Sequence, residues 1–379
     1  MQVLETVFWA SLLLGLYPYA GYPLVAAALA SLRARVAPTG ATPRSVSVVI
    51  SAFNEAAVIE ATVLNKLQQD FDGTLEVLVA SDGSDDGTDE IVAAIARRDD
   101  RVKLFRQHPR QGKTAALNQL LRQARGEIVV FADANSMYRP DAVRRLVDAF
   151  ADGSVGYVTG KMIYVSELGT PVGTGCTAYM RYENRLREIE SRLGSVVGVD
   201  GGIDAVRRAL YQPMRADQLP DFVLPLAVVR QGYRVAFVPS AVLEETTLEK
   251  GDAEFRMRVR VSLRALWALR DNADLLAGRA GALFAWQLWS HKALRYGSFV
   301  PLGVSVLAGV TLAALSPGHE YLLALIFGYG VCAAAGALGL RLPGVTHAYY
   351  FALLNVASLV ATLRFLRGEK QVLWTPRLG

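Results

Sequence analysis

Apolar and polar positions divide this chain into three regions. Residues 3–30 are almost continuously apolar and carry a single charge, Glu5. Charged residues are dense from about residue 33 to residue 279, and the chain turns apolar again from residue 298. A run as long as the first can cross the hydrocarbon core of a bilayer, which is about 30 Å thick. The pattern therefore predicts membrane helices at both ends of a water-exposed domain.

The first apolar run, residues 1–32, predicts an uncleaved membrane anchor. It lacks the basic start of a signal peptide, and it is longer than the apolar core of one. Pro18 and Pro23 are expected to kink this helix, which bilayer helices tolerate.

The C-terminal region, residues 298–366, predicts further spans at 298–316, 320–341 and 346–366, separated by "SPGHE" and "RLPG". The preceding segment, 280–297, mixes Trp, Tyr, His, Lys and Arg. That composition is typical of an interfacial helix at the level of the lipid headgroups.

Basic residues near the spans predict the orientation. Arg33, Arg35 and Arg44 follow the first span, so the middle domain, residues 33–279, is expected in the cytoplasm. A basic tail, residues 367–379, also favours the inside, whereas three spans after a cytoplasmic domain would leave it outside. The number of spans thus stays open. We expect an integral protein of a bacterial inner membrane with a cytoplasmic catalytic domain.

The middle domain alternates strand-like and helix-like patterns. Alternation at this spacing predicts an α/β fold with a mostly parallel sheet and helices on both faces. The expected strands are 45–53, 75–81, 101–107 and 127–135, and the expected helices are 88–98, 112–124 and 139–150. In such sheets ligands bind beyond the carboxyl ends of the strands.

Polar clusters follow three of these strands: Asn54-Glu55, Asp82-Gly83-Ser84 and Asp133-Asn135. A carboxylate such as Asp133 can hold a hard cation or a sugar hydroxyl, and Asn135 can add an amide oxygen. Magnesium takes only one or two protein carboxylates when phosphates supply other ligands. Helix capping is the alternative reading of both residues.

Two further residues lie at predicted helix starts. Lys113 opens a helix, where a cation opposes the helix dipole. This mismatch favours a phosphate or nucleotide role, and a solvated lysine stays open as the alternative. Asp221 comes just before a predicted apolar helix. It is either a functional carboxylate or the N-cap of that helix. A glycine-rich loop at 198–202 comes before an expected helical run, and the arginine-dense segment 254–269 could neutralise a diphosphate or form a lipid-facing surface.

Composition adds little to this picture. The chain has 379 residues, 52% of them hydrophobic, and a formal net charge of +5. Its mean hydropathy is +0.25 and its pI about 9.2. The basic balance suits anionic lipid or an anionic substrate, and without a basic-aromatic cluster we expect no nucleic acid partner. The two cysteines, Cys176 and Cys332, indicate neither a disulfide framework nor a zinc site.

Five stretches in this order resemble a membrane-anchored family 2 glycosyltransferase with the GT-A fold. They are "VSVVISAFNEA", "VLVASDGSDDGT", "GKTAALNQ", "FADAN" and "LPDF". The chain departs from the family's usual pattern at Ser81, Asn135 and Pro220, where acids are common. The resemblance implies an inverting enzyme that uses a nucleoside-diphosphate sugar, with UDP as the expected nucleotide, and a divalent cation, Mg²⁺ or Mn²⁺.

The resemblance also implies roles for single residues. Asp221 would be the catalytic base. Asp133 and Asn135 would hold the metal. The glycine-rich turn, Asp200, Gly201 and Gly202, is assigned to a donor–acceptor loop. The expected nucleotide-sugar contacts are Ala52, Phe53, Glu55, Asp82, Lys113, Asp133, Arg258 and Arg260.

The acceptor is expected to be a lipid-linked or cell-surface glycan, extended by one or a few sugars at the membrane. A processive polysaccharide synthase is an alternative. The Gln-x-x-Arg-Trp motif of such synthases would align with residues 257–261, where only the arginine is present. A third reading is a catalytically weak subunit that binds nucleotide sugar, for which Asn135 is the best argument.

Overall fold

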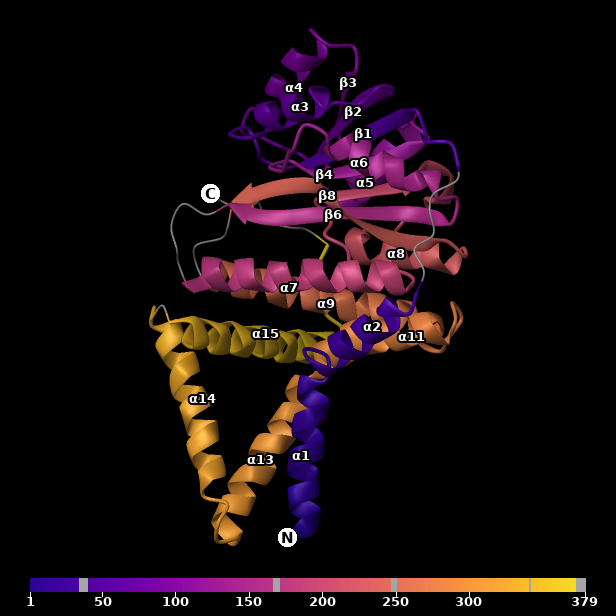
Figure 1. The fold of residues 1–379 in the computed structure, drawn as a ribbon. Coiled ribbons are helices and arrows are strands. Elements are labelled where there is room, and N and C mark those ends of the chain that lie inside the picture. Colours follow the sequence, from indigo (N-terminus) through magenta and orange to yellow (C-terminus); the bar gives the residue numbers. More distant parts are fainter. Residues whose placement is uncertain (34–39, 166–170, 247–250, 341, 373–379) are drawn as a thin grey trace.

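The computed structural model of the protein describes residues 1–33, 40–165, 171–246, 251–340 and 342–372. Its largest part is an α/β domain on a mixed eight-stranded sheet with the strand order β3-β2-β1-β4-β7-β6-β8-β5. Figure 1 shows this domain at the top and the terminal helices below it. Arg35 and most of the basic tail lie outside the described residues.

The first half of the sheet is parallel, as its apolar runs predict. Its strands are β1 (Ser45–Ala52), β2 (Thr74–Ser81), β3 (Val102–Arg106) and β4 (Ile128–Asp133). Val48 of β1 lies in one apolar core and Val49 in the other. Burial on both faces explains why these strands are largely apolar rather than alternating. The register pairs Ser51 with Asp133, so the polar strand ends meet at one edge.

Helices cover both faces of the sheet. One core receives side chains from α3 (Ile59–Leu67), α4 (Thr88–Ala96) and α6 (Ala142–Asp148). The other receives them from α5 (Lys113–Gln123), α8 (Pro220–Arg230) and α9 (Gly251–Asp271). Figure 1 shows α9 and α7 (Pro171–Leu193) together between the sheet and the terminal helices.

The second half of the sheet makes it mixed rather than mostly parallel. It contains β5 (Met137–Tyr138), β6 (Val155–Val165), β7 (Ile203–Arg207) and β8 (Arg234–Thr246), and β7 runs antiparallel between β4 and β6. The helical run expected after the glycine-rich loop is therefore wrong. Hydrogen bonding on both edges and burial on both faces outweigh the local helical preference of this segment.

The N-terminal anchor is not one straight span. It forms α1 (Gln2–Leu16) and α2 (Gly21–Ser31), which are bent by 57° at a break that contains Pro18. α1 packs against α13 (Phe299–Leu315), whereas α2 packs against α7 of the domain. In Figure 1, α1 and α13 run side by side away from the domain, and α2 lies against it.

The expected interfacial segment is a broken helix. It consists of α11 (Ala282–Leu288), the π-helical turn η3 (Trp289–Ala293) and α12 (Leu294–Gly297). The last two helices, α14 (Tyr321–Ala337) and α15 (Pro343–Leu366), are separated at the predicted break. Figure 1 shows α15 lying across the base of the domain beside α9, while α14 extends away from it.

The prediction of membrane helices at both ends needs correction. Among the described helices, one segment, Gly344–Leu366, is by itself long and apolar enough to cross a bilayer. Up to three spans result if each bent pair, α1 with α2 and 282–297 with α13, counts as one. The bends split the apolar runs into pieces shorter than the roughly 20 residues that a span needs. One clear candidate remains, near the C-terminus.

Candidate active site

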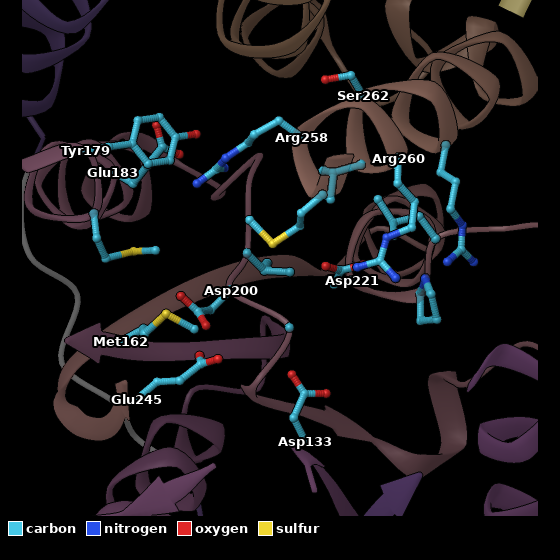
Figure 2. Close-up of a pocket in the computed structure, with 18 of the residues that line it drawn as sticks. Asp133, Met162, Tyr179, Glu183, Asp200, Asp221, Glu245, Arg258, Arg260 and Ser262 are labelled. Carbon is cyan, nitrogen blue, oxygen red and sulfur yellow. The ribbon is translucent and has the colours of Figure 1, made fainter. Parts of the chain in front are cut away.

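A cavity of about 330 Å³ lies beyond the carboxyl ends of β1 and β4. Figure 2 shows Asp133, Asp221 and Arg260 toward one side of it, and Tyr179 and Glu183 toward the other. We call the part around Lys113, Asp133, Gly201 and Asp221 the sheet end. The part around Tyr19, Tyr179, Glu183, Lys292 and Arg295 is the helix end. Residues of α9 line the cavity between α7 and α8.

Asp133 and Lys113 form an ion pair at the sheet end. Asp133 is the last residue of β4 and Lys113 the first of α5, and Lys113 Nζ donates to Asp133 Oδ1 at 2.5 Å. Helix α6 begins only at Ala142, so capping does not explain Asp133. The second carboxylate oxygen of Asp133 points toward the glycine turn, 3.6 Å from where a Cβ of Gly202 would lie.

The turn after β4 is supported from inside the domain by Lys66. This side chain is fully buried, and its ammonium donates to Ser136 O at 2.5 Å and to Asn65 Oδ1 at 3.0 Å. Burial lowers the pKa of Lys66 to about 7. Lys66 thus fixes the backbone that carries Asp133 and Asn135. The sequence contained a signal for it, a lysine at an apolar position of a helix.

The glycine turn brings a second carboxylate to the sheet end. Gly201 has a φ of +94°, and an ideal Cβ on it would lie 2.8 Å from Asp221 Oδ2. Only glycine fits this approach without displacement. Asp221 lies in the first turn of α8, whose N-cap position is Leu219 and has no side-chain cap. Burial raises the pKa of Asp221, and the neighbouring cations Lys113 and Arg264 partly offset that rise.

Two buried acids hold the glycine turn. Asp204 Oδ2 accepts from Tyr157 Oη at 2.7 Å and from the Gly201 N–H at 3.0 Å. Burial raises the pKa of Asp204 to about 7. Asp200 pairs with Arg187 at 3.1 Å, and its Oδ1 has no hydrogen-bond partner among the described residues. Asp204 was not a predicted site residue, because its segment was expected to be helical and is a strand in the fold.

The predicted nucleotide contacts occupy different surroundings. Glu55 lines the cavity, and Ala52 is buried at the end of β1. The Phe53 ring lies under the Arg110 guanidinium, 3.4 Å from the ring centroid. Asp82 is fully buried, and protein groups engage both of its oxygens. The donors are Gln107 Nε2 at 2.6 Å, the N–H groups of Gln111 and Gly112 at 2.8 and 3.0 Å, and Arg110 Nε at 3.4 Å.

Asp82 therefore acts on the site through the loop that it holds. That loop ends at Gly112, directly before Lys113, so the hydrogen bonds of Asp82 fix the start of α5. A base or ribose would have to displace these donors to reach the carboxylate. The expected contact of Asp82 with the nucleotide sugar stays a prediction, whereas its hydrogen bonds to the loop before Lys113 are seen in the structure.

The two predicted arginines of α9 both line the cavity. Arg258 is committed to neighbours. Its Nε donates to Glu254 Oε1 at 2.7 Å, and its Nη2 donates to Tyr350 Oη at 2.8 Å. Tyr350 belongs to α15, so this network ties the C-terminal helix to the wall of the cavity. Arg260 lies close enough to Lys113 to affect its electrostatics.

Known proteins share this arrangement of elements. The model of the family "Glycosyl transferase family 2" matches residues 47–212. The mannosyltransferase PcManGT from Pyrobaculum calidifontis, solved in complex with GDP-Man and Mn²⁺, superimposes with a TM-score of 0.76 at 25% identity, covering 97% of this chain and 99% of that one. Residues 47–212 are a glycosyltransferase family 2 domain. The fold is GT-A-like.

Curated relatives agree with this assignment. An N-acetylglucosaminyltransferase of Rhizobium leguminosarum bv. viciae is 26% identical over 251 residues, which are 61% of this chain and 57% of that protein. A beta-monoglucosyldiacylglycerol synthase of Trichormus variabilis is 30% identical over 166 residues, 43% of this chain and 36% of the relative. The chain thus matches about half or less of their lengths. These similarities support a glycosyltransferase.

The family 2 domain ends before the base candidate. The matched segment contains Lys113, Asp133 and the glycine turn, whereas Asp221 and the α9 arginines follow it. The described residues contain no group of three or more His, Cys, Asp or Glu side chains placed to hold a metal ion. The oxygens of Asp133 and Asn135 fit a cation that draws its other ligands from phosphate and water, as Mg²⁺ does.

Proposed function

We propose that this protein is an inverting glycosyltransferase. It moves a sugar from a nucleoside-diphosphate donor to a hydroxyl of a membrane-associated acceptor, one or a few sugars at a time. The observation that carries the proposal is the placement of Lys113, Asp133 and Asp221 around one glycine turn in one cavity. This set combines a cation-binding carboxylate, a phosphate-binding ammonium and a carboxylate base.

The donor diphosphate would lie at the sheet end. Asp133 and Asn135 would hold a divalent cation, and that cation would neutralise charge on the leaving diphosphate. Lys113 and Arg260 would contact the phosphate oxygens, because both line the sheet side of the cavity. Arg258, held by Glu254 and Tyr350, would contribute to the field without leaving those partners.

Asp221 would act as the general base. It removes the proton of the acceptor hydroxyl while the acceptor oxygen bonds to the anomeric carbon of the sugar. The bond from that carbon to the diphosphate oxygen breaks, and the nucleoside diphosphate leaves with the electron pair. The raised pKa of Asp221 favours this role, since a base whose pKa lies nearer to neutral accepts a proton more readily.

The protein would work at a membrane, with the domain in the cytoplasm. Supporting observations are the candidate span Gly344–Leu366 and the similarity to a beta-monoglucosyldiacylglycerol synthase. The division into an anchor (1–32), a catalytic domain (33–279), an interfacial segment (280–297), membrane helices (298–366) and a tail (367–379) is part of this proposal.

A panel of nucleotide sugars tests the proposal. Purified protein in detergent is incubated with UDP- and GDP-linked sugars, with and without Mg²⁺ or Mn²⁺, and release of nucleoside diphosphate is measured. The GDP arm is included because PcManGT binds GDP-Man. Binding and turnover of one donor support the proposal. Binding without turnover favours a non-catalytic subunit, and formation of a long polymer favours a processive synthase. If the protein neither binds nor turns over any donor, all three hypotheses are rejected.

A further inference from the structure

The helix end of the cavity contains a cation that the donor site does not use. We propose that Lys292, which lies near Arg295 and Arg187, binds a phosphate group on the acceptor. This inference rests on the proposed function. The acceptor would then be a phosphate-bearing lipid rather than a neutral glycolipid. The argument depends on the partners of these cations and on the elements that surround them.

Lys292 reaches the cavity from an unusual backbone turn. It lies in the π-helical turn η3, and such turns often occur at functional sites. Its side chain lines the cavity and passes Gly198, where any Cβ would collide with Lys292 Nζ. Across the described residues, no hydrogen bond or ion pair of this ammonium is found, and its neighbour is the Phe222 ring at 5.7 Å.

The two arginines of the helix end form ion pairs, whereas the buried carboxylate of Glu190 does not pair with a lysine or an arginine among the described residues. Arg295 donates to Glu183 Oε1 at 2.6 Å, and Arg187 pairs with Asp200 at 3.1 Å. Glu190, a further buried acid nearby, accepts from Tyr22 Oη at 2.5 Å and from the Val197 N–H at 3.0 Å. His291 Nδ1 is also 2.7 Å from Glu190.

Lys292 is therefore near two buried carboxylates, Glu183 and Glu190, but among the described residues neither bonds its ammonium. An ammonium inside a cavity is costly unless an anion or water satisfies it. A phosphate is a suitable anion, because it offers several oxygens to the ammonium and to neighbouring guanidinium groups. Arg187 already donates to Gly198 O, Asn184 Oδ1, Asp200 Oδ2 and Val199 O, and Glu183 offsets the charge of Arg295, so Lys292 is the group that would contact the phosphate directly.

The surroundings indicate a lipid as the carrier of this phosphate. The helix end is walled by Tyr19, between α1 and α2, by Tyr296 of α12, and by Leu354 and Ser358 of α15. It thus lies where the terminal helices meet the domain (Figure 1). Tyrosines and basic residues are typical of the headgroup level of a bilayer.

Direct binding tests the inference without relying on turnover. The probes are farnesyl phosphate, farnesol and inorganic phosphate, added to the full chain in detergent and followed by calorimetry. The variants are Lys292→Gln, which removes the charge, Lys292→Arg, which keeps it, and Lys103→Gln, which removes a charge on the outer strand β3. GDP and UDP binding is measured for each as the donor-site control.

Farnesyl phosphate should bind wild type and Lys103→Gln more tightly than farnesol does. Lys292→Gln should weaken it about 10- to 100-fold, the effect of losing a charged hydrogen bond, while Lys292→Arg keeps most of the affinity. Nucleotide binding should not change, which also shows that the variant is folded. Equal binding of inorganic phosphate would indicate a free anion and reject the lipid.

Equal affinity for farnesol and farnesyl phosphate, or no effect of Lys292→Gln beside intact nucleotide binding, would overturn this inference and leave the proposed function standing. If the wild-type protein binds no nucleotide, the proposed function is overturned, and this inference with it. The two failures are therefore distinguishable in one set of titrations.

Discussion

Gly201 lies so close to Asp221 that a single added Cβ would come within 2.8 Å of the carboxylate oxygen. The contact joins the turn before β7 to the first turn of α8, two segments that the sequence treats as separate motifs. It also fixes how near the carboxylate of Asp221 can come to the floor of the cavity. The geometry of the proposed base is therefore set by a residue without a side chain.

Gly201→Ala should reduce transfer by about 100-fold or more, because the methyl group displaces Asp221 and small shifts of catalytic groups are costly. The measurement is kcat/KM for nucleoside diphosphate release. Gly232→Ala is the matched control, since Gly232 also has a positive φ, +87°, but nothing within 4 Å of its Cβ position. Equal losses in the two variants would show that backbone strain alone is responsible.

Asp221→Asn should reduce transfer by roughly 10²- to 10⁴-fold and leave donor binding intact, since it removes a general base and little volume. Single-turnover kinetics with saturating donor, together with calorimetric nucleotide binding, separate the two effects. Asp217→Asn provides a nearby acid outside the cavity as a control. Retained turnover in Asp221→Asn would assign the base elsewhere.

Asp133→Ala should abolish transfer, because it removes both the proposed cation ligand and the partner of Lys113. Asn135→Asp should retain transfer and lower the Mn²⁺ concentration needed for half-maximal activity, since a second carboxylate adds charge at the cation. A metal titration of initial rates checks both. If Asp133→Ala is fully active, the assignment of this strand end is wrong.

The kcat/KM of transfer should rise with pH through a pKa above the ordinary aspartate value of about 3.9, because burial raises the pKa of Asp221 and only its ionised form is a base. Lys113 lowers that pKa. Lys113→Met should therefore move the acid limb of the pH profile to higher pH, whatever it does to the maximal rate. Lys103→Met should not move the limb.

Asp204 should make folding stability fall as pH rises. Its pKa is raised from 3.8 to about 7 by burial, so the unfolded chain releases this proton at lower pH than the folded protein does. The contribution of protonated Asp204 to the free energy of unfolding is fully present below about pH 4, and it is lost as the pH rises through about 7. Between pH 5 and 8 the change is on the order of 2 kcal/mol for this group.

Asp204→Asn keeps an uncharged side chain at every pH, so its stability relative to wild type should improve from pH 5 to pH 8. Thermal melting of the detergent-solubilised protein at both pH values measures this. An unchanged difference in Tm between variant and wild type would mean that Asp204 is ionised in the folded protein. The same variant reports on the glycine turn, because Asp204 accepts from the Gly201 N–H.

Local patterns predicted most of the parallel half-sheet. Apolar runs bounded by turn residues placed β1 to β4, and polar residues at their ends placed Glu55 and Asp133 on the cavity. Local sequence patterns gave the wrong element where hydrogen bonding between strands decided the structure. Segment 203–207 is helical by local preference and a strand in the fold, because β4 and β6 hydrogen-bond to both of its edges.

The sequence by itself determined which side chains stand at strand ends and helix starts, because those positions follow from short-range periodicity and turn chemistry. Tertiary structure decided what these side chains do. In the folded protein, Lys113 pairs with Asp133, and Asp221 lies against Gly201. Arg258 donates hydrogen bonds to Glu254 and Tyr350, and Asp82 is buried beneath the loop before α5. Apart from Arg258 and Glu254, which are one helical turn apart, these partners are separated by 20 to 92 positions. Contacts at that distance along the chain depend on burial and charge pairing in the folded protein, which local sequence pattern does not record.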